Sequence, residues 1–133
     1  MTRSNTLGRE ERLKSRKLID HLFKSGQRFS AGSFRVSYEL VPGTYELKFG
    51  ITAGTRHFKR ATDRNRIKRL GREAWRLHNA ELKQLLTEKN AGLHVFLIYT
   101  SREIPVFEQV REQLAKVLAS LFKIINEKIP SDT

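Results

Sequence analysis

The sequence contains no cysteine and no long apolar run. Without cysteine, neither a disulfide framework nor a thiolate zinc site can form, and a reducing cytoplasm is the natural compartment. No apolar stretch approaches the roughly 18 residues of a membrane span, and the first residues lack the apolar segment of a signal peptide. These absences predict a soluble, cytoplasmic protein that does not associate with a membrane.

Groups suited to acid–base or metal chemistry are also scarce. The only aspartates are Asp20, Asp63 and Asp132, and the four histidines fall in different predicted elements. A nuclease acting alone needs clustered carboxylates for metal ions, or a histidine pair for general acid and base catalysis. We therefore assign no catalytic residue and no bound metal or other cofactor to the protein itself.

Positive charge, by contrast, is abundant and concentrated. The 133 residues include 26 lysines and arginines against 14 acids, a net charge of +12. Residues 1–28 hold eight basic and three acidic side chains, and residues 56–76 hold nine basic and two acidic ones, while the rest of the chain balances. Such an excess indicates a polyanionic partner, and its placement indicates two cooperating basic patches.

Hydrophobic periodicity predicts a single domain over residues 9–128, with a flexible segment 1–8 and a frayed segment 129–133. The predicted elements are a helix over 10–24, strands over 33–41 and 45–53 joined as a hairpin, a helix from an N-cap at Thr62 or Asp63 to about 86, a strand over 94–99, and a helix from Pro105 to about 125. This order, α-β-β-α-β-α, is typical of a small α/β (α+β) sandwich with helices covering a short sheet.

The helix predicted from residue 62 has two chemically different faces. Projection at 100 degrees per residue gathers an apolar arc, which must meet the sheet: Ile67, Leu70, Gly71, Ala74 and Leu77. The opposite arc is basic or polar: Arg64, Asn65, Lys68, Arg69, Arg72 and Arg76. Trp75 falls near the polar side, and the pattern leaves open whether it packs inward or lies beside a ligand.

Like charges three or four residues apart destabilise an isolated helix by a few tenths of a kcal/mol per pair, so an external anion is expected. A phosphate backbone suits this role, because guanidinium groups bind phosphate oxygens in pairs and the helix N-terminus also favours an anion. The alternative is that the arginines lie along the core or pair with nearby acids, for which Asp63 and Glu73 are available.

The run from Arg64-Asn65-Arg66 to Arg76 closely resembles the Arg-Asn-Arg signature of the bacterial ribonuclease P protein component. Residues 50–53 resemble the family's strand before the basic loop, and residues 12–26 resemble its first helix. The resemblance covers about residues 10–125. It implies a mixed sheet with a left-handed βαβ crossover, against the hand that patterning alone would favour.

The resemblance also implies partners and site residues. The family's protein binds a catalytic RNA, which would cleave phosphodiester bonds with its own Mg²⁺, and it binds the 5′ leader of precursor tRNA. The residues carried over to the catalytic RNA are Arg64, Asn65, Arg66, Lys68, Arg69, Arg72, Arg76, Lys59 and Arg60. Those carried over to the leader are Phe23, Phe34, Val36, Tyr38 and Arg56. The sequence leaves open the alternative that Phe23 and Phe34 are core residues. The protein itself is expected to be monomeric.

The chain departs from the family at two positions, and other functions compete. Ile19 stands where the family often has an aromatic residue, and Gly54-Thr55 precedes Arg56 where the family usually has two lysines. The main alternative is a ribosomal or ribosome-assembly protein, which would also place an arginine-rich helix on a small sheet. A DNA-binding transcription factor and an autonomous metal nuclease are further alternatives.

Overall fold

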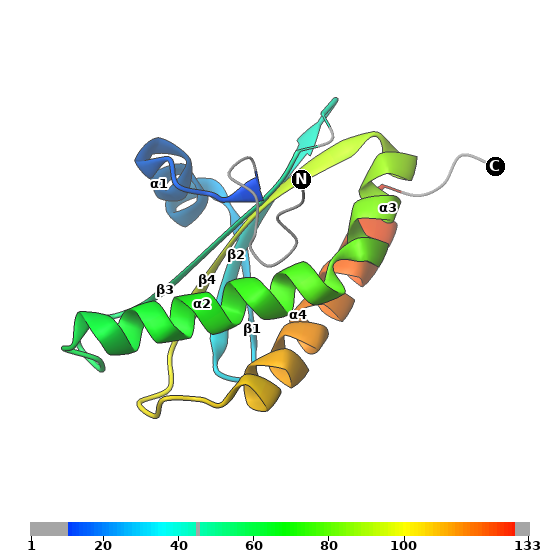
Figure 1. The fold of residues 1–133 in the computed structure, drawn as a ribbon. Helices are drawn as coiled ribbons and strands as arrows, with labels where there is room; N and C mark the ends of the chain where they lie inside the picture. The colour runs from blue at the N-terminus through cyan, green and yellow to red at the C-terminus, as the bar shows by residue number, and fades with distance from the viewer. Residues whose placement is uncertain (1–10, 45, 130–133) are drawn as a thin grey trace, which may run out of the picture.

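A four-stranded mixed sheet organises the protein (Figure 1). The computed structural model describes residues 11–44 and 46–129. The elements are α1 (Arg16–Ser25), β1 (Gln27–Ala31), β2 (Phe34–Pro42), β3 (Leu47–Ala53), α2 (Ala61–His78), α3 (Ala80–Lys89), β4 (Ala91–Tyr99) and α4 (Phe107–Lys128). The predicted sandwich class is confirmed, although the element order was incomplete. The predictions for residues 1–8 and 130–133 concern segments outside the described residues.

The strand order is β1-β2-β4-β3, so the predicted hairpin between β2 and β3 is wrong. β4 lies between them, antiparallel to β2 and parallel to β3. The chain leaves β2 at Gly43, whose φ of 80° lies in the left-handed region. It then crosses the end of β4, where the Leu93 amide donates a hydrogen bond to the Glu46 carbonyl at 2.7 Å. Period-two alternation identified both strands but carries no information on which strand is the neighbour.

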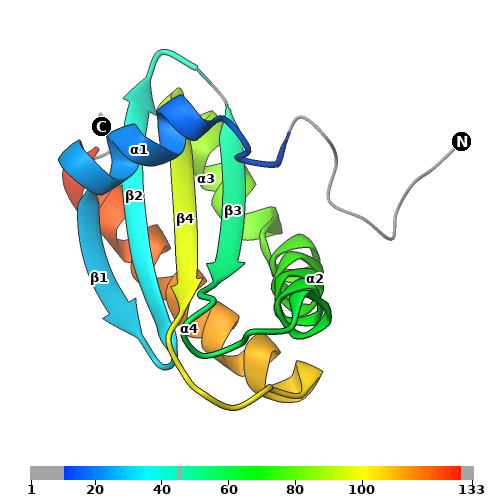
Figure 2. The same cartoon turned by 90° about the vertical axis from the view of Figure 1, so that its left-hand side faces the viewer.

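The actual hairpin joins β1 to β2 through Gly32, whose φ of 60° is accessible to glycine without strain. β1 was not predicted because it is a short edge strand whose side chains alternate only between exposed and half-buried. Parallel β3 and β4 are connected through α2 and α3. Figure 2 shows this connection passing behind the sheet, on the side away from α1, which makes the crossover left-handed as the family resemblance implied.

Each face of the sheet covers a separate apolar cluster. The larger cluster lies beneath α2, α3 and α4 and includes the inward side of α4, where the predicted 3.6-residue periodicity is confirmed by Val110, Leu114, Val117, Leu118, Leu121 and Ile125. The smaller cluster lies under α1 and consists of Leu13, Leu22 and Phe96. β4 contributes to both clusters, as expected for a strand covered on both faces.

Several helix boundaries differ from their predictions. α1 begins at Arg16 rather than residue 10, because Ser15 caps it by accepting a hydrogen bond from the Leu18 amide at 3.3 Å. The helix predicted to run to residue 86 is two helices, α2 and α3, that meet at the buried Asn79. No helix in the described part of the chain is long and apolar enough to span a membrane.

Gly50 in β3 allows a close approach under α1. A Cβ atom there would lie 2.6 Å from the Phe96 ring and 2.9 Å from the backbone oxygen of Leu13. We expect Gly50→Ala to lower the free energy of unfolding by about 1–3 kcal/mol, because the added methyl group overpacks this cluster. Urea denaturation measures the loss. Gly54→Ala is the control, since its nearest atom would be 4.0 Å away; equal losses in both variants would contradict this explanation.

Candidate RNA interface

α2 starts without a side-chain cap. Its N-cap residue is Arg60, not Thr62 or Asp63 as predicted, and the first turn closes through backbone bonds from the Asp63 and Arg64 amides to the Arg60 carbonyl, both at 3.2 Å. Asp63 lies inside the first turn, where its charge complements the positive end of the helix dipole. Helical periodicity located this end to within two or three residues. The identity of the cap depends on the geometry of the preceding loop, which the pattern does not contain.

One side of α2 packs tightly on the sheet. Ile67, Gly71, Ala74 and Trp75 are buried, and the Trp75 ring stacks on Phe49 of β3 with 4.3 Å between ring centroids. The sequence pattern did not decide whether Trp75 packs inward or lies beside a ligand; in the structure Trp75 lies in the core. Leu77, predicted on the packed arc, is instead exposed, because the helix rotates to bury the larger indole ring.

The other side of α2 carries the predicted basic residues. Asn65, Arg66 and Arg69 are exposed, and Lys68 and Arg72 are half-buried. The side chains of Arg66, Lys68 and Arg69 make no hydrogen bond or ion pair with any other described residue. Arg66 and Arg69, one turn apart, therefore extend from the exposed side of α2, and the half-buried Lys68 lies at the flank of the side that packs on the sheet.

Two further arginines of α2 have partners within the protein. Arg64 donates hydrogen bonds to the carbonyls of Phe58 and Lys59, at 2.6 and 3.0 Å. Arg76 pairs with Glu73 at 2.7 Å, and this hydrogen bond raises the pKa of Arg76. The alternative that arginines pair with local acids is therefore correct for Arg76. Arg64 instead ties the preceding loop to the helix.

The loop of residues 54–60 is anchored by Phe58, which was not predicted from the sequence as a site residue. Phe58 is buried, its ring stacks on Tyr99 at 6.1 Å, and its amide donates to the Gly54 carbonyl. A phenylalanine within an otherwise polar loop is the sequence signal that could have indicated this anchor. With Phe58 held inside, the neighbouring cations face solvent: Arg56, Lys59 and Arg60.

The predicted leader residues do not form one surface. Phe34, Val36 and Tyr38 are only 1%, 0% and 7% exposed, and all three lie in the larger core. The prediction that they line a binding surface is wrong, because their side of β2 faces the helices α2 to α4 rather than α1. Alternation showed that they share a face but not which layer covers it.

The α1 side of the sheet presents a different set of residues. Phe23 of α1 is 36% exposed and touches Phe96 of β4 edge to face, with ring centroids 5.7 Å apart. Arg35, Ile98 and Thr52 form one cross-strand row on β2, β4 and β3, and Ile98 packs against the smaller core. Figure 2 shows α1 crossing one end of the sheet and leaving the other end of this face uncovered.

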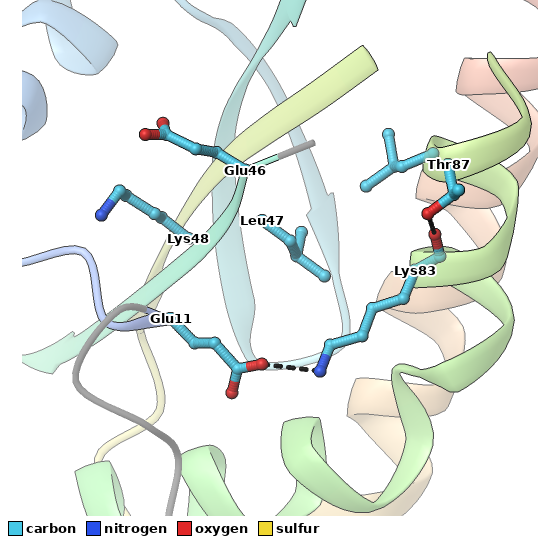
Figure 3. A pocket seen from close by; sticks show the side chains of 7 residues that line it. Glu11, Glu46, Leu47, Lys48, Lys83 and Thr87 are labelled. Atoms are coloured by element: carbon cyan, nitrogen blue, oxygen red, sulfur yellow. Dashed lines mark hydrogen bonds and ion pairs between the residues drawn. The ribbon is translucent and has the colours of Figure 1, made fainter. Parts of the chain in front are cut away.

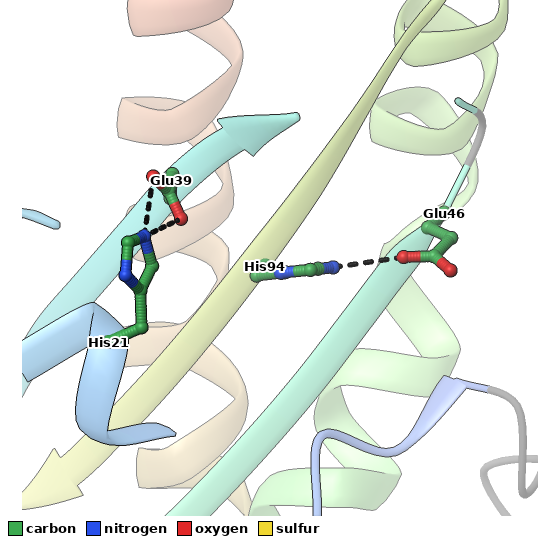
Figure 4. Close-up of polar contacts among 4 residues, drawn as sticks. All are labelled: His21, Glu39, Glu46 and His94. Atoms are coloured by element: carbon green, nitrogen blue, oxygen red, sulfur yellow. Dashed lines mark hydrogen bonds and ion pairs between the residues drawn. The ribbon is translucent and has the colours of Figure 1, made fainter. Parts of the chain in front are cut away.

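Two histidine–glutamate pairs lie along this side (Figure 4). His21 of α1 contacts Glu39 of β2 at 3.0 Å, and the buried His94 of β4 donates to Glu46 at 3.0 Å. The His94 hydrogen bond is the main cause that lowers the pKa of Glu46, with a smaller contribution from the charge of Lys48. The pairs therefore join α1 to β2 and β4 to the start of β3.

The lowered pKa of Glu46 predicts a pH-dependent contribution to stability. A carboxyl group with a lowered pKa in the folded state stabilises above its unfolded pKa, and this stabilisation is lost as the pH falls through the folded pKa. Glu46→Gln should therefore reduce the free energy of unfolding at neutral pH by less than about 1 kcal/mol, since the carboxylate is half-exposed. Once the pH is below the folded pKa of Glu46, the variant and the parent should be equally stable in urea denaturation. A difference that persists in acid would contradict the assignment.

A hollow of about 590 Å³ lies between β3, α3 and the segment before α1 (Figure 3). Its charged side chains already pair, Glu11 with Lys83 at 2.6 Å and Glu46 with His94. Across residues 11–44 and 46–129, no group of three or more histidine or carboxylate side chains is arranged to hold a metal ion. The basic surface of α2 and its loop is therefore the stronger candidate site.

A family model described as Ribonuclease P matches residues 7–122 of this sequence. The chain belongs to the ribonuclease P protein family. The ribonuclease P protein component of Porphyromonas gingivalis W83 is 32% identical over 115 residues, covering 84% of this chain and 83% of that protein. That of Chlorobaculum tepidum is 32% identical over 131 residues, covering 90% and 84%.

Solved structures of ribonuclease P proteins share the fold. The protein from Thermotoga maritima has a TM-score of 0.65 at 27% identity, covering 83% of this chain and 96% of that one. A structure from Staphylococcus aureus has a TM-score of 0.62 at 20% identity, covering 84% and 94%. As a ribonuclease P protein, the chain is the protein part of an endoribonuclease of tRNA processing, and the ribonuclease P RNA is its partner. The ribosomal and transcription-factor alternatives are set aside by this membership.

Proposed function

We propose that α2 and the loop before it bind the ribonuclease P RNA, and that the uncovered α1 side of the sheet binds the 5′ leader of precursor tRNA. The observation that carries the first part is that Arg66, Lys68 and Arg69 have no protein partner among the described residues, while the packed side of α2 fixes the helix to the sheet. The protein acts as a cytoplasmic monomer that assists removal of the leader.

Phosphate chemistry supports the RNA contact. Guanidinium groups donate paired hydrogen bonds to phosphate oxygens, and each neutralised phosphate releases condensed counterions. Asn65 adds a neutral donor and acceptor for a ribose or base. Lys59 and Arg60 extend the surface. Arg64 and Arg76 add positive charge to it, and their contacts with Phe58 and Glu73 also order the loop and the helix. Arg72, on the same helix, is half-buried.

For the leader, the structure supports a floor different from the one predicted. Phe23 presents a partly exposed ring beside Phe96, which suits stacking on an unpaired base. The row of Arg35, Ile98 and Thr52 continues the surface beyond α1 with one cation and apolar atoms. Arg56 lies in the loop that follows β3, at the same end of the sheet as Thr52.

In this proposal the RNA subunit and its Mg²⁺ carry out phosphodiester hydrolysis, and the protein raises the affinity for precursor tRNA and screens repulsion between the two RNAs. The test adds the purified protein to ribonuclease P RNA and precursor tRNA at low magnesium. Faster cleavage at the mature 5′ end is the expected result. Cleavage by the protein alone, or no gain on adding it, would reject the proposal.

Arg69→Ala should weaken binding of the ribonuclease P RNA and reduce its salt dependence. One lost phosphate contact removes roughly 0.7 to 0.9 from the slope of log affinity against log salt concentration. Arg69 is a sharper probe than Arg64, whose removal would also release the loop. Lys116→Ala, an exposed cation on α4, is the control and should leave the slope unchanged. The same slope for Arg69→Ala and the parent would mean that Arg69 does not contact the RNA.

Phe23→Ala should weaken holoenzyme binding of precursor tRNA by at least about fivefold, because stacking on one base contributes about 1–3 kcal/mol. Mature tRNA, which lacks the leader, should bind as before. Phe122→Ala is a matched control, since Phe122 on α4 is 37% exposed against 36% for Phe23. Equal effects on the two tRNAs would remove Phe23 from the leader site.

A further inference from the structure

The segment before α1 is fixed to the sheet and to α3 by three contacts. Glu11 pairs with Lys83 of α3, as Figure 3 shows, and Arg12 forms a parallel bridge with Phe49 of β3. The Leu13 amide donates to the Phe49 carbonyl at 2.9 Å, and the Leu13 side chain is buried in the smaller core. Arg12 therefore occupies a defined position at the outer edge of β3.

The bridge also decides which way Arg12 points. Partners directly opposite each other in a sheet project to the same face, so Arg12 lies on the same face as Phe49. The Phe49 ring stacks on Trp75 of α2, so this face is the one that α2 covers. Arg12 thus lies against α2, on the opposite face from Leu13, whose side chain packs under α1.

At this position the Arg12 guanidinium has a hydrogen-bond donor without an acceptor. Its Nε atom is buried and has no hydrogen-bond partner. Buried donors in folded proteins are almost always bonded, so an unbonded one calls for an acceptor. Among the described residues, Glu11, which precedes Arg12, pairs with Lys83, and Glu73, which follows Arg72, bonds Arg76 through both oxygens.

A second arginine lies close by. Arg72, on the turn of α2 that precedes Trp75 and Arg76, is half-buried, and no described residue forms a hydrogen bond or ion pair with its side chain. Burial and the nearby positive charge of Arg12 both lower the pKa of Arg72. Both arginines thus lie on the α2 side of the sheet and partly out of water, and no described carboxylate pairs with either of them.

We infer that Arg12 and Arg72 clamp one phosphate group of the ribonuclease P RNA backbone between the segment before α1 and α2. Two guanidinium forks suit a phosphate, whose oxygens accept several charged hydrogen bonds at once, better than they suit a single neutral acceptor. The inference rests on the proposed RNA-binding function and adds a contact from outside the basic helix. It also gives a physical link between the two basic stretches of the sequence.

The test compares Arg12→Gln, Arg72→Gln and the double variant with the full-length parent in binding ribonuclease P RNA. Each single variant should bind about tenfold more weakly, as for loss of a charged hydrogen bond. The salt slope should fall by roughly 0.7 to 0.9 only in the double variant, because in each single variant the other arginine still neutralises the phosphate. Because both arginines hold one phosphate, the double variant should lose less than the product of the two single effects. Lys123→Gln, an exposed cation on α4, is the control.

Melting of the free protein separates a clamp from a structural role. Removing one of two repelling, partly buried cations should leave the melting temperature unchanged or raise it, while RNA binding falls. A lower melting temperature for Arg12→Gln with an unchanged affinity for the RNA would overturn the clamp. If Arg69→Ala weakens RNA binding and Arg12→Gln does not, only the clamp fails; if neither does, the proposed function fails with it.

Discussion

The stack of Trp75 on Phe49 is the contact on which the arrangement of the molecule depends. It fixes the rotation of α2 on the sheet and therefore decides which arginines face solvent. The same β3 residue pairs through its backbone with the segment before α1, so that one position holds both basic stretches of the chain in register. An interface rich in like charges needs such an apolar anchor, because mutual repulsion would otherwise separate its parts.

Features set by hydrophobic periodicity could be predicted from the sequence, whereas features that depend on spatial neighbours could not. The buried side of α4 is indicated by a spacing of 3.6 residues, β2 and β3 by a spacing of two, and β4 by a nearly continuous apolar run. The pairing of β2 with β4 is a long-range choice that no local pattern encodes. The same gap explains the error at Phe34, since alternation groups residues by face but does not say whether α1 or α4 covers that face.

The site shows the same division. Charge and spacing located the basic face of α2, but not that Arg64 bonds the carbonyls of the preceding loop, that Phe58 anchors this loop, or that Arg12 lies beside α2. Each depends on a loop or an isolated bridge whose geometry is set by packing. The left-handed crossover is the clearest example, because general rules of chain handedness favour the opposite hand and only the family resemblance pointed to it.

The position of β4 between β2 and β3 also delays formation of the sheet while the chain is being synthesised. During synthesis β2 and β3 leave the ribosome well before β4, so each exposes an unpaired edge until residue 99 has emerged. Pairing over such a sequence separation is slow compared with local helix formation. Because α2 packs on β3, the basic surface of α2 becomes rigid only when the last strand enters the middle of the sheet.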